Sequence, residues 1–177
     1  MTDLRNYLSL IKKSGDLKII KKKVSTKYEI AGITAKVDGS TAILFENIAE
    51  SDFNLVANLV GTRKRFAQAI GSTEEKIHEN MIFAIKKAKK PKIVSSGKFM
   101  ENKSRNIFIM PIVTHFEKES GPFITSSIVY VKNPETGEQN SSFHRMMPID
   151  KTHFSIRMVE GRHLKKRYID ETDHHHH

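Results

Sequence analysis

Apolar residues in the first part of the chain alternate between helical and strand spacing. Leu4, Leu8 and Ile11 recur on one helix face. Thr2 with Asp3 begins this helix, and Gly15 follows it as a left-handed cap would. After this helix a strand is predicted at residues 17–24, followed by a helix at 27–37 capped by Ser25 or Thr26. Two strands follow at 41–45 and 53–60. A helix is then predicted at 63–70, between Thr62 and Gly71, and a longer helix from Ser72 or Thr73 to the lysines at 86–90. This alternation predicts an α/β domain over residues 1–105, with 91–105 as a linker.

After residue 106 the pattern changes to that of a sheet. Strands are predicted at residues 107–113, 123–132, 139–147 and 153–158, and the Asn-Pro-Glu-Thr-Gly turn at 133–137 joins the second to the third. A further helix is predicted to begin at Gly161. These few strands cannot close a barrel, so residues 106–173 are expected to form part of a split β-barrel that a partner chain or further sequence completes. The predicted fold class is α/β (α+β).

Composition narrows the class of protein. The 177 residues include no cysteine, which excludes disulfides and Cys-ligated metal sites and fits a reducing cytoplasm. No apolar run has membrane-spanning length. The formal net charge is +10, but the lysines are spread along the chain, so a solvated surface is favoured over a nucleic-acid-binding one. Residues 174–177, all histidine, are interpreted as a purification tag and excluded from site reasoning.

Candidate chemistry is concentrated between residues 139 and 167. An amide, a hydroxyl and a guanidinium lie on one predicted strand, at Asn140, Ser142 and Arg145. An imidazole follows at the predicted helix start, in the sequence Gly161-Arg162-His163. This pattern alone does not name a ligand. Arg145 could be a surface cation, and His163 could be a solvent-exposed residue of the helix N-terminus.

Strand alternation divides the candidate residues between two faces. One face is expected to carry Asn140, Ser142 and His144, and the other Ser141, Phe143 and Arg145. A bend or bulge near Phe143 would therefore be needed for Asn140 and Arg145 to reach one ligand.

The chain resembles the UbiD family of decarboxylases, which use prenylated flavin mononucleotide (prenylated FMN). The likeness runs from Asp3 to about Tyr168. DLRNYLSLIKKSGDLKII is similar to the opening helix and strand of the family, NLVGTRKRFAQAIG to a characteristic inner segment, and GPFITSSIVYVKNPETGEQNSSFHRM to the hairpin that leads into its cofactor site. The most specific feature is the Asn-x-Ser-x-x-Arg pattern with His163 eighteen residues beyond Arg145. The resemblance implies that the partial barrel binds flavin.

The resemblance also implies roles for the residues of this pattern. Asn140 and His163 match protein ligands of a divalent metal, expected to be Mn²⁺, which holds the flavin phosphate; K⁺ is a further candidate ion. Amide oxygen and imidazole are suitable donors for such a metal. Ser142, Phe143 and His144 match residues that line the isoalloxazine ring through backbone and side-chain contacts.

Arg145 matches the arginine of a Glu-Arg-Glu network beside the flavin and the substrate carboxylate, and Arg162 matches a polar cofactor contact. A guanidinium can bind a carboxylate with two parallel hydrogen bonds. The glutamates of the network and the third metal ligand match no position here, and Glu160 and Glu171 do not replace them. We therefore expect the chain to be inactive until a second chain or a C-terminal part supplies these acids, because the intermediate needs a positioned proton donor.

Three functions remain open at this point. The first is the N-terminal portion or small subunit of an oligomeric decarboxylase that acts on unsaturated or aromatic carboxylic acids. The second is a non-catalytic flavin- or phosphate-binding or assembly module. The third is a basic nucleic-acid-binding protein, which would bind oligonucleotides with a strong dependence on salt.

Overall fold

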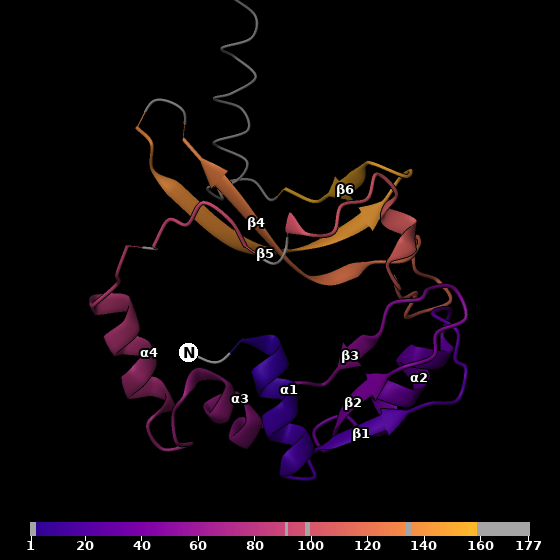
Figure 1. Cartoon of the computed structure of the whole chain (residues 1–177), viewed down its shortest axis with the longest axis horizontal. Coiled ribbons are helices and arrows are strands. Elements are labelled where there is room, and N and C mark those ends of the chain that lie inside the picture. The colour runs from indigo at the N-terminus through magenta and orange to yellow at the C-terminus, as the bar shows by residue number, and fades with distance from the viewer. Residues whose placement is uncertain (1–2, 91, 98–99, 134–135, 159–177) are drawn as a thin grey trace, which may run out of the picture. The chain divides into compact units, whose positions relative to one another are not determined.

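The computed structural model of the chain describes residues 3–90, 92–97, 100–133 and 136–158 (Figure 1). The chain divides into two compact units: residues 1–104 with 109–111, and residues 105–108 with 112–177. The elements of the first unit are α1 (Leu4–Lys13), β1 (Leu17–Ile20), α2 (Glu29–Lys36), β2 (Ala42–Phe45), β3 (Leu55–Ala57), α3 (Arg63–Ile70) and α4 (Ile77–Lys86). The predicted mixture of helices and short strands, an α/β class, is confirmed.

The sheet of the first unit is built around β2. β1 pairs with it in parallel and β3 in antiparallel orientation, so the strand order is β1-β2-β3. Three of the four residues of β2 are fully buried, namely Ala42, Ile43 and Phe45. Tyr7 and Ile11 of α1 belong to the same core as Ala42. The strand predicted at residues 41–45 is therefore confirmed, and it is buried. Leu4, placed on the same helix face by its spacing, is 55% exposed.

Two helices have the ends that their sequences predict. The side chain of Asp3 accepts a hydrogen bond from the Asn6 backbone N–H at 2.8 Å and caps α1. The Thr62 hydroxyl does the same for the Arg65 N–H in α3. Gly71 ends α3 in the left-handed conformation, with φ of 70°.

The predicted caps of the other two helices are wrong. α2 starts after Tyr28, whose side chain makes no capping bond, and it is the carboxylate of Glu29 that accepts the Ser25 N–H at 2.8 Å. α4 starts only at Ile77, because the Ser72 hydroxyl is bonded to Asn80 and to the Thr73 carbonyl instead of to a helix amide. A polar residue before a helix therefore predicts a cap only where its hydroxyl has no competing partner.

A buried arginine ties three segments of the first unit together. Arg65 is 1% exposed. Its Nε donates to the carbonyl of Leu59 at 3.1 Å, its Nη2 to that of Asn58 at 3.0 Å, and its Nη1 to that of Ser40. The Tyr7 hydroxyl in turn donates to the Arg65 carbonyl at 2.8 Å. Burial raises the pKa of this phenol, against the opposing effect of the guanidinium, so it stays a donor. The guanidinium thus joins α3 to the segments before β2 and after β3.

Replacing Arg65 should destabilise the first unit. Arg65→Ala removes the donors of buried carbonyls, and we expect the free energy of unfolding to fall by about 3 kcal/mol. Urea unfolding followed by circular dichroism measures this change. Lys64→Ala, an exposed substitution in the same helix, is the control and should have an effect below about 0.5 kcal/mol. Equal unfolding midpoints for the two variants would contradict the role of Arg65.

The second unit contains a three-stranded sheet of β4 (Ile124–Lys132), β5 (Gln139–Pro148) and β6 (Phe154–Ile156), in that order and antiparallel throughout. At the β4–β5 turn the Asn133 N–H donates to the Glu138 carbonyl at 2.8 Å, and Gly137 has φ of 70°. The hairpin predicted from the turn sequence is present, with residues 134 and 135 outside the described part.

The predicted strand at residues 107–113 is wrong. A short 3-10 helix, η2 (Ile107–Ile109), and a single β-bridge between Val113 and Phe123 stand in its place. The side chain of Asn106 accepts the Phe108 N–H at 3.1 Å, a local bond that favours a turn over an extended chain. The predicted helix at Gly161 lies outside the described residues.

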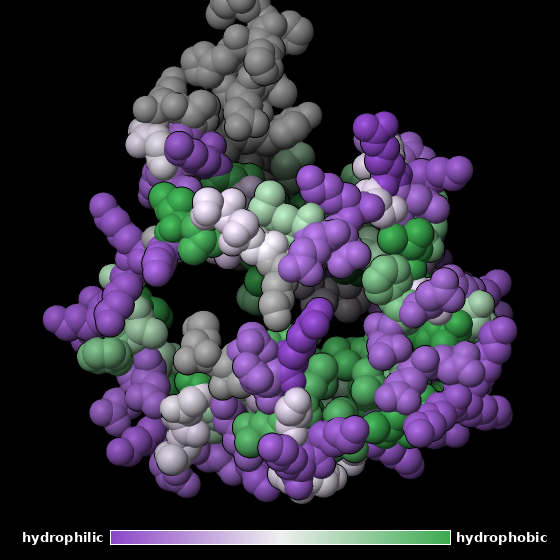
Figure 2. Space-filling model, viewed as in Figure 1, coloured by the Kyte–Doolittle hydropathy of each residue, from purple (hydrophilic) through white to green (hydrophobic). Residues whose placement is uncertain are grey.

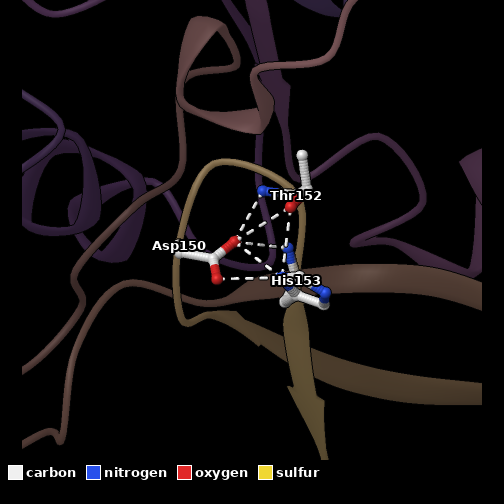
Figure 3. Close-up of polar contacts among 3 residues, drawn as sticks. All are labelled: Asp150, Thr152 and His153. Atoms are coloured by element: carbon white, nitrogen blue, oxygen red, sulfur yellow. Dashed lines mark hydrogen bonds and ion pairs between the residues drawn. The ribbon is translucent and has the colours of Figure 1, made fainter.

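The turn between β5 and β6 is organised by one carboxylate (Figure 3). Asp150 accepts hydrogen bonds from the backbone N–H groups of Thr152 and His153 at 2.8 and 2.9 Å, and its Oδ2 lies 2.8 Å from the His153 Nδ1. The bond from the Thr152 N–H, followed by that from the His153 side chain, lowers the pKa of Asp150 from 3.8 to about 2. The ionised form is therefore the one that holds the turn.

This turn should loosen in acid. Because the pKa of Asp150 is lowered by folding, its contribution is complete above pH 3.8 and is lost as the pH falls through about 2. Hydrogen-exchange protection factors of the Thr152 and His153 amides should fall over this range. Asp150→Ala should lower them already at neutral pH, whereas Lys151→Ala in the same turn should not. Unchanged protection in Asp150→Ala would refute this explanation of the turn.

Hydrophilic side chains cover much of the visible surface of the first unit (purple in Figure 2). α4 is different, since it buries Ile77 but exposes a series of large apolar residues, Met81, Ile82, Phe83 and Ile85. Among the described helices, none combines the length and the apolar character needed to cross a membrane.

Candidate functional site

The candidate residues of β5 lie on its two faces in strict alternation. Asn140, Ser142 and His144 are on the half-buried face, as predicted. Phe143 is 77% exposed, and the side chain of Arg145 is 61% exposed. Period-two alternation therefore separates the predicted amide ligand from the predicted catalytic guanidinium.

The half-buried face carries a small polar cluster. The Ser142 hydroxyl and the His144 Nε2 are 2.8 Å apart, so the imidazole is held by a neighbour on its own strand. Ser127 of β4 is the cross-strand partner of His144. Its hydroxyl oxygen is buried and has no hydrogen-bond partner among the described residues. A buried hydroxyl without a hydrogen-bond partner costs stability, so Ser127 adds an unsatisfied polar atom beside His144.

The pairing register of the hairpin shifts, and the extra residue lies on β4, not on β5. Pairing is regular from Gln139 to His144, and the register then shifts between Ile124 and Ser127 of β4. Two β4 residues, Thr125 and Ser126, stand opposite Arg145, which is the arrangement of a β-bulge. The register shift lies opposite Arg145, two residues beyond Phe143, and its extra residue belongs to β4. It does not bring Asn140 to the face of Arg145.

Arg145 is held by groups that precede β4. Its Nη1 donates to the Oε1 of Glu119 at 3.3 Å, and its guanidinium carbon lies 4.2 Å from the centre of the Phe123 ring. The Glu119 side chain is only 8% exposed. Its other oxygen accepts the His115 backbone N–H at 2.9 Å. An ion pair and a cation–π contact thus constrain an otherwise exposed arginine.

Along the candidate residues, one edge of β5 is open in the sense that no strand of the described residues pairs with it. β4 pairs with β5 from Gln139 to Met146, and β6 pairs on the other edge only from Met146 to Pro148. No other described strand pairs with residues 139–145 on that second edge. A ligand placed there could reach backbone groups of β5 and side chains of both faces, which no ligand lying on one face can do.

The second half of the predicted site cannot be located. Arg162 and His163 lie outside the described residues. The described part of the chain contains no group of three or more His, Asp or Glu side chains placed to hold a metal ion. The proposed metal ligands Asn140 and His163 are therefore not seen together, and their role stays a prediction.

Family models match almost the whole chain. The 3-octaprenyl-4-hydroxybenzoate carboxy-lyase N-terminal domain (UbiD_N) matches residues 8–85, and the Rift-related domain of the same enzyme (UbiD) matches residues 86–175. The chain belongs to the UbiD family. The resemblance seen in the hairpin is thus confirmed at the level of family.

Curated UbiD relatives are more than twice as long as this chain. The anhydromevalonate phosphate decarboxylase of Methanothermobacter thermautotrophicus is 28% identical over 161 residues, covering 91% of this chain and 37% of that protein. One subunit of the 4-hydroxybenzoate decarboxylase of Chlamydia pneumoniae is 26% identical over 192 residues, covering 93% of this chain and 32% of that protein. The chain therefore corresponds to about a third of these relatives.

Solved UbiD-class structures share the fold. HmfF from Pelotomaculum thermopropionicum in complex with FMN superposes with a TM-score of 0.88 at 27% identity, covering 94% of this chain and 39% of that one. The Sedimentibacter hydroxybenzoicus vanillic acid decarboxylase (ShVdcCD) in its closed form gives a TM-score of 0.85 at 21% identity, covering 96% and 40%. The second match supports the fold alone.

Two residues of the candidate site were not found from the sequence. Ser127 could have been found from the hairpin, because the pairing of Lys132 with Gln139 at the turn fixes Ser127 opposite His144. No pairing or spacing in the sequence indicates Glu119 in the same way. It lies before the sheet, and its approach to Arg145 depends on the path of a loop that no periodic pattern describes.

Proposed function

We propose that this chain is the N-terminal portion or small subunit of a UbiD-type decarboxylase that uses prenylated FMN and acts on unsaturated or aromatic carboxylic acids. Membership of the family supports the reaction class. The similarity to HmfF, whose structures contain FMN and prenylated FMN, supports the cofactor. The observation that carries the proposal is β5 itself. Ser142 and His144 lie on one face and Arg145 on the other, and the edge between them is paired with no described strand.

The residues of β5 fit a flavin ring. An isoalloxazine edge presents both donors and acceptors, which suits the backbone of an open strand edge together with hydroxyl and imidazole side chains. Bound prenylated FMN would supply the electron sink that decarboxylation needs and that no side chain provides. Ser142, Phe143 and His144 would line the ring.

Arg145 would bind and orient the carboxylate to be lost. Glu119 uses one edge of its guanidinium, and the side chain is otherwise exposed, so the remaining N–H groups can reach a ligand. A planar pair of donors holds a carboxylate in one orientation. We further propose that Asn140 and His163 hold a divalent metal at the flavin phosphate and that Arg162 contacts the cofactor.

Protonation of the product would need an acid from elsewhere. Glu119, the acid beside Arg145, is already engaged by the His115 amide and the guanidinium. We therefore propose that further UbiD sequence, in the same or a second chain, supplies the glutamates. The exposed apolar side chains of α4 support an additional covering element, since patches of this kind mark contact surfaces. That relatives include one subunit of a 4-hydroxybenzoate decarboxylase, together with ShVdcCD, is consistent with a second chain.

Cofactor binding tests the proposed function. FMN, as a surrogate for prenylated FMN, is titrated into the purified chain with Mn²⁺, and flavin fluorescence is recorded. Ser142→Ala should weaken binding about tenfold, the effect of one lost hydrogen bond to a bound group. Ser141→Ala, one residue away on the opposite face, is the matched control and should bind as the wild type does. Asn140→Ala and His163→Ala should remove the Mn²⁺ dependence.

The outcomes separate the three functions. Tight, metal-dependent binding followed by decarboxylation once a glutamate-bearing UbiD chain is added supports the enzyme. Tight binding that never leads to carbon dioxide release with that chain supports a non-catalytic flavin-binding module. Equal binding by the Ser142→Ala and Ser141→Ala variants would refute the role of β5. Salt-sensitive retention of oligonucleotides without flavin binding would favour the nucleic-acid-binding alternative.

A further inference from the structure

A binding arginine must be held in place to be effective. The side chain of Arg145 is 61% exposed and can adopt many rotamers in water. Ordering such a side chain costs free energy each time a ligand binds, unless the protein has ordered it beforehand. The surroundings of Arg145 therefore decide how strongly it can bind a carboxylate.

Glu119 has the properties of a fixed support. Its side chain is 8% exposed, and both carboxylate oxygens are engaged: Oε2 accepts the His115 N–H at 2.9 Å and Oε1 accepts the Arg145 Nη1 at 3.3 Å. Its own backbone N–H donates to the Phe116 carbonyl at 3.1 Å. The His115 Nδ1 lies 3.8 Å from Oε2. The loop thus holds Glu119 through its Oε2 and its backbone N–H, which leaves Oε1 to bind Arg145.

Phe123 fixes the plane of the same guanidinium. Its ring centre lies 4.2 Å from the guanidinium carbon, a distance at which the face of the ring attracts the cation. Phe123 immediately precedes β4, and its N–H donates to the Val113 carbonyl at 3.0 Å. Glu119 thus holds one edge of the Arg145 guanidinium, and Phe123 holds one of its faces. Together they leave the opposite edge for a ligand.

We propose that Glu119 is a positioning residue for Arg145, holding one edge of the guanidinium so that the other binds the carboxylate of the substrate. The inference rests on the proposed function for the identity of the ligand. Glu119 touches neither substrate nor cofactor in this arrangement. It acts only through Arg145.

The sign of a substitution effect distinguishes positioning from simple electrostatics. A carboxylate beside Arg145 repels an anionic ligand, so removing its charge alone should strengthen anion binding. Loss of positioning should weaken it. Glu119→Gln keeps an oxygen that can accept from Arg145 and loses the charge, whereas Glu119→Ala loses both. The two variants therefore separate the effects.

The experiment uses the full chain labelled with ¹⁵N and sodium benzoate as the probe. The Arg145 Nε–H signal, assigned with Arg145→Lys, reports both side-chain order, by relaxation, and benzoate affinity, by its shift. We expect Glu119→Ala to make the signal mobile and to weaken benzoate binding about fivefold to tenfold. Glu119→Gln should keep the signal ordered and bind benzoate at least as well as wild type. Glu117→Gln, an exposed acid in the same loop, is the control and should change neither.

Each outcome decides the proposal. Stronger benzoate binding by Glu119→Ala, or an Arg145 signal as ordered as in wild type, would overturn it, and so would the absence of any benzoate shift in the wild-type chain. If Glu119→Ala does not fold, Glu119→Met, which keeps the length of the side chain without a carboxylate acceptor, takes its place, and an ordered Arg145 signal in that variant would overturn the proposal as well. The readout needs no flavin, so a failure of cofactor binding, which would refute the proposed function, is seen separately.

Discussion

The two-residue period of β5 is the constraint on which the candidate site depends. Backbone pairing with β4 fixes the strand from Gln139 onward, and this pairing determines the face on which each side chain lies. Ser142 and His144 meet on the half-buried face because they are two residues apart. Arg145, one residue further, must point the other way. The site is therefore not a pocket on one face but two groups of side chains on either side of an open strand edge.

Much of this arrangement follows from the sequence, since it depends on local rules. Thr62 and Gly71 bound α3 as their side-chain and backbone preferences require. The Asn-Pro-Glu-Thr-Gly turn fixes the hairpin, and with it the faces of β5. The predictions failed where two local hydrogen-bonding patterns compete. Glu29 accepts the Ser25 amide before α2, and the Asn106 side chain accepts the Phe108 amide where a strand was predicted. The bulge on β4 has no signal in the types of its residues.

The Glu119–Arg145 pair joins a residue of the family motif to a residue outside it. The resemblance identifies Arg145 through a motif and assigns its acids to sequence beyond this chain. The structure adds an acid from the loop before β4, buried and bound at both oxygens. One of its oxygens accepts the His115 N–H and the other accepts Arg145. The support of Arg145 thus comes from a residue that the motif does not include.

The hydrogen bonds of Arg65 to backbone carbonyls constrain how the first unit folds. The partners of Arg65 come from Ser40, Asn58 and Leu59, so its guanidinium is satisfied only after the segments around β2, β3 and α3 have all assembled. A partly assembled unit would enclose a cation without acceptors, which is strongly unfavourable. Burial of the Arg65 guanidinium before these segments assemble is therefore unfavourable. The cost of burying this charge without acceptors favours a cooperative assembly of the first unit.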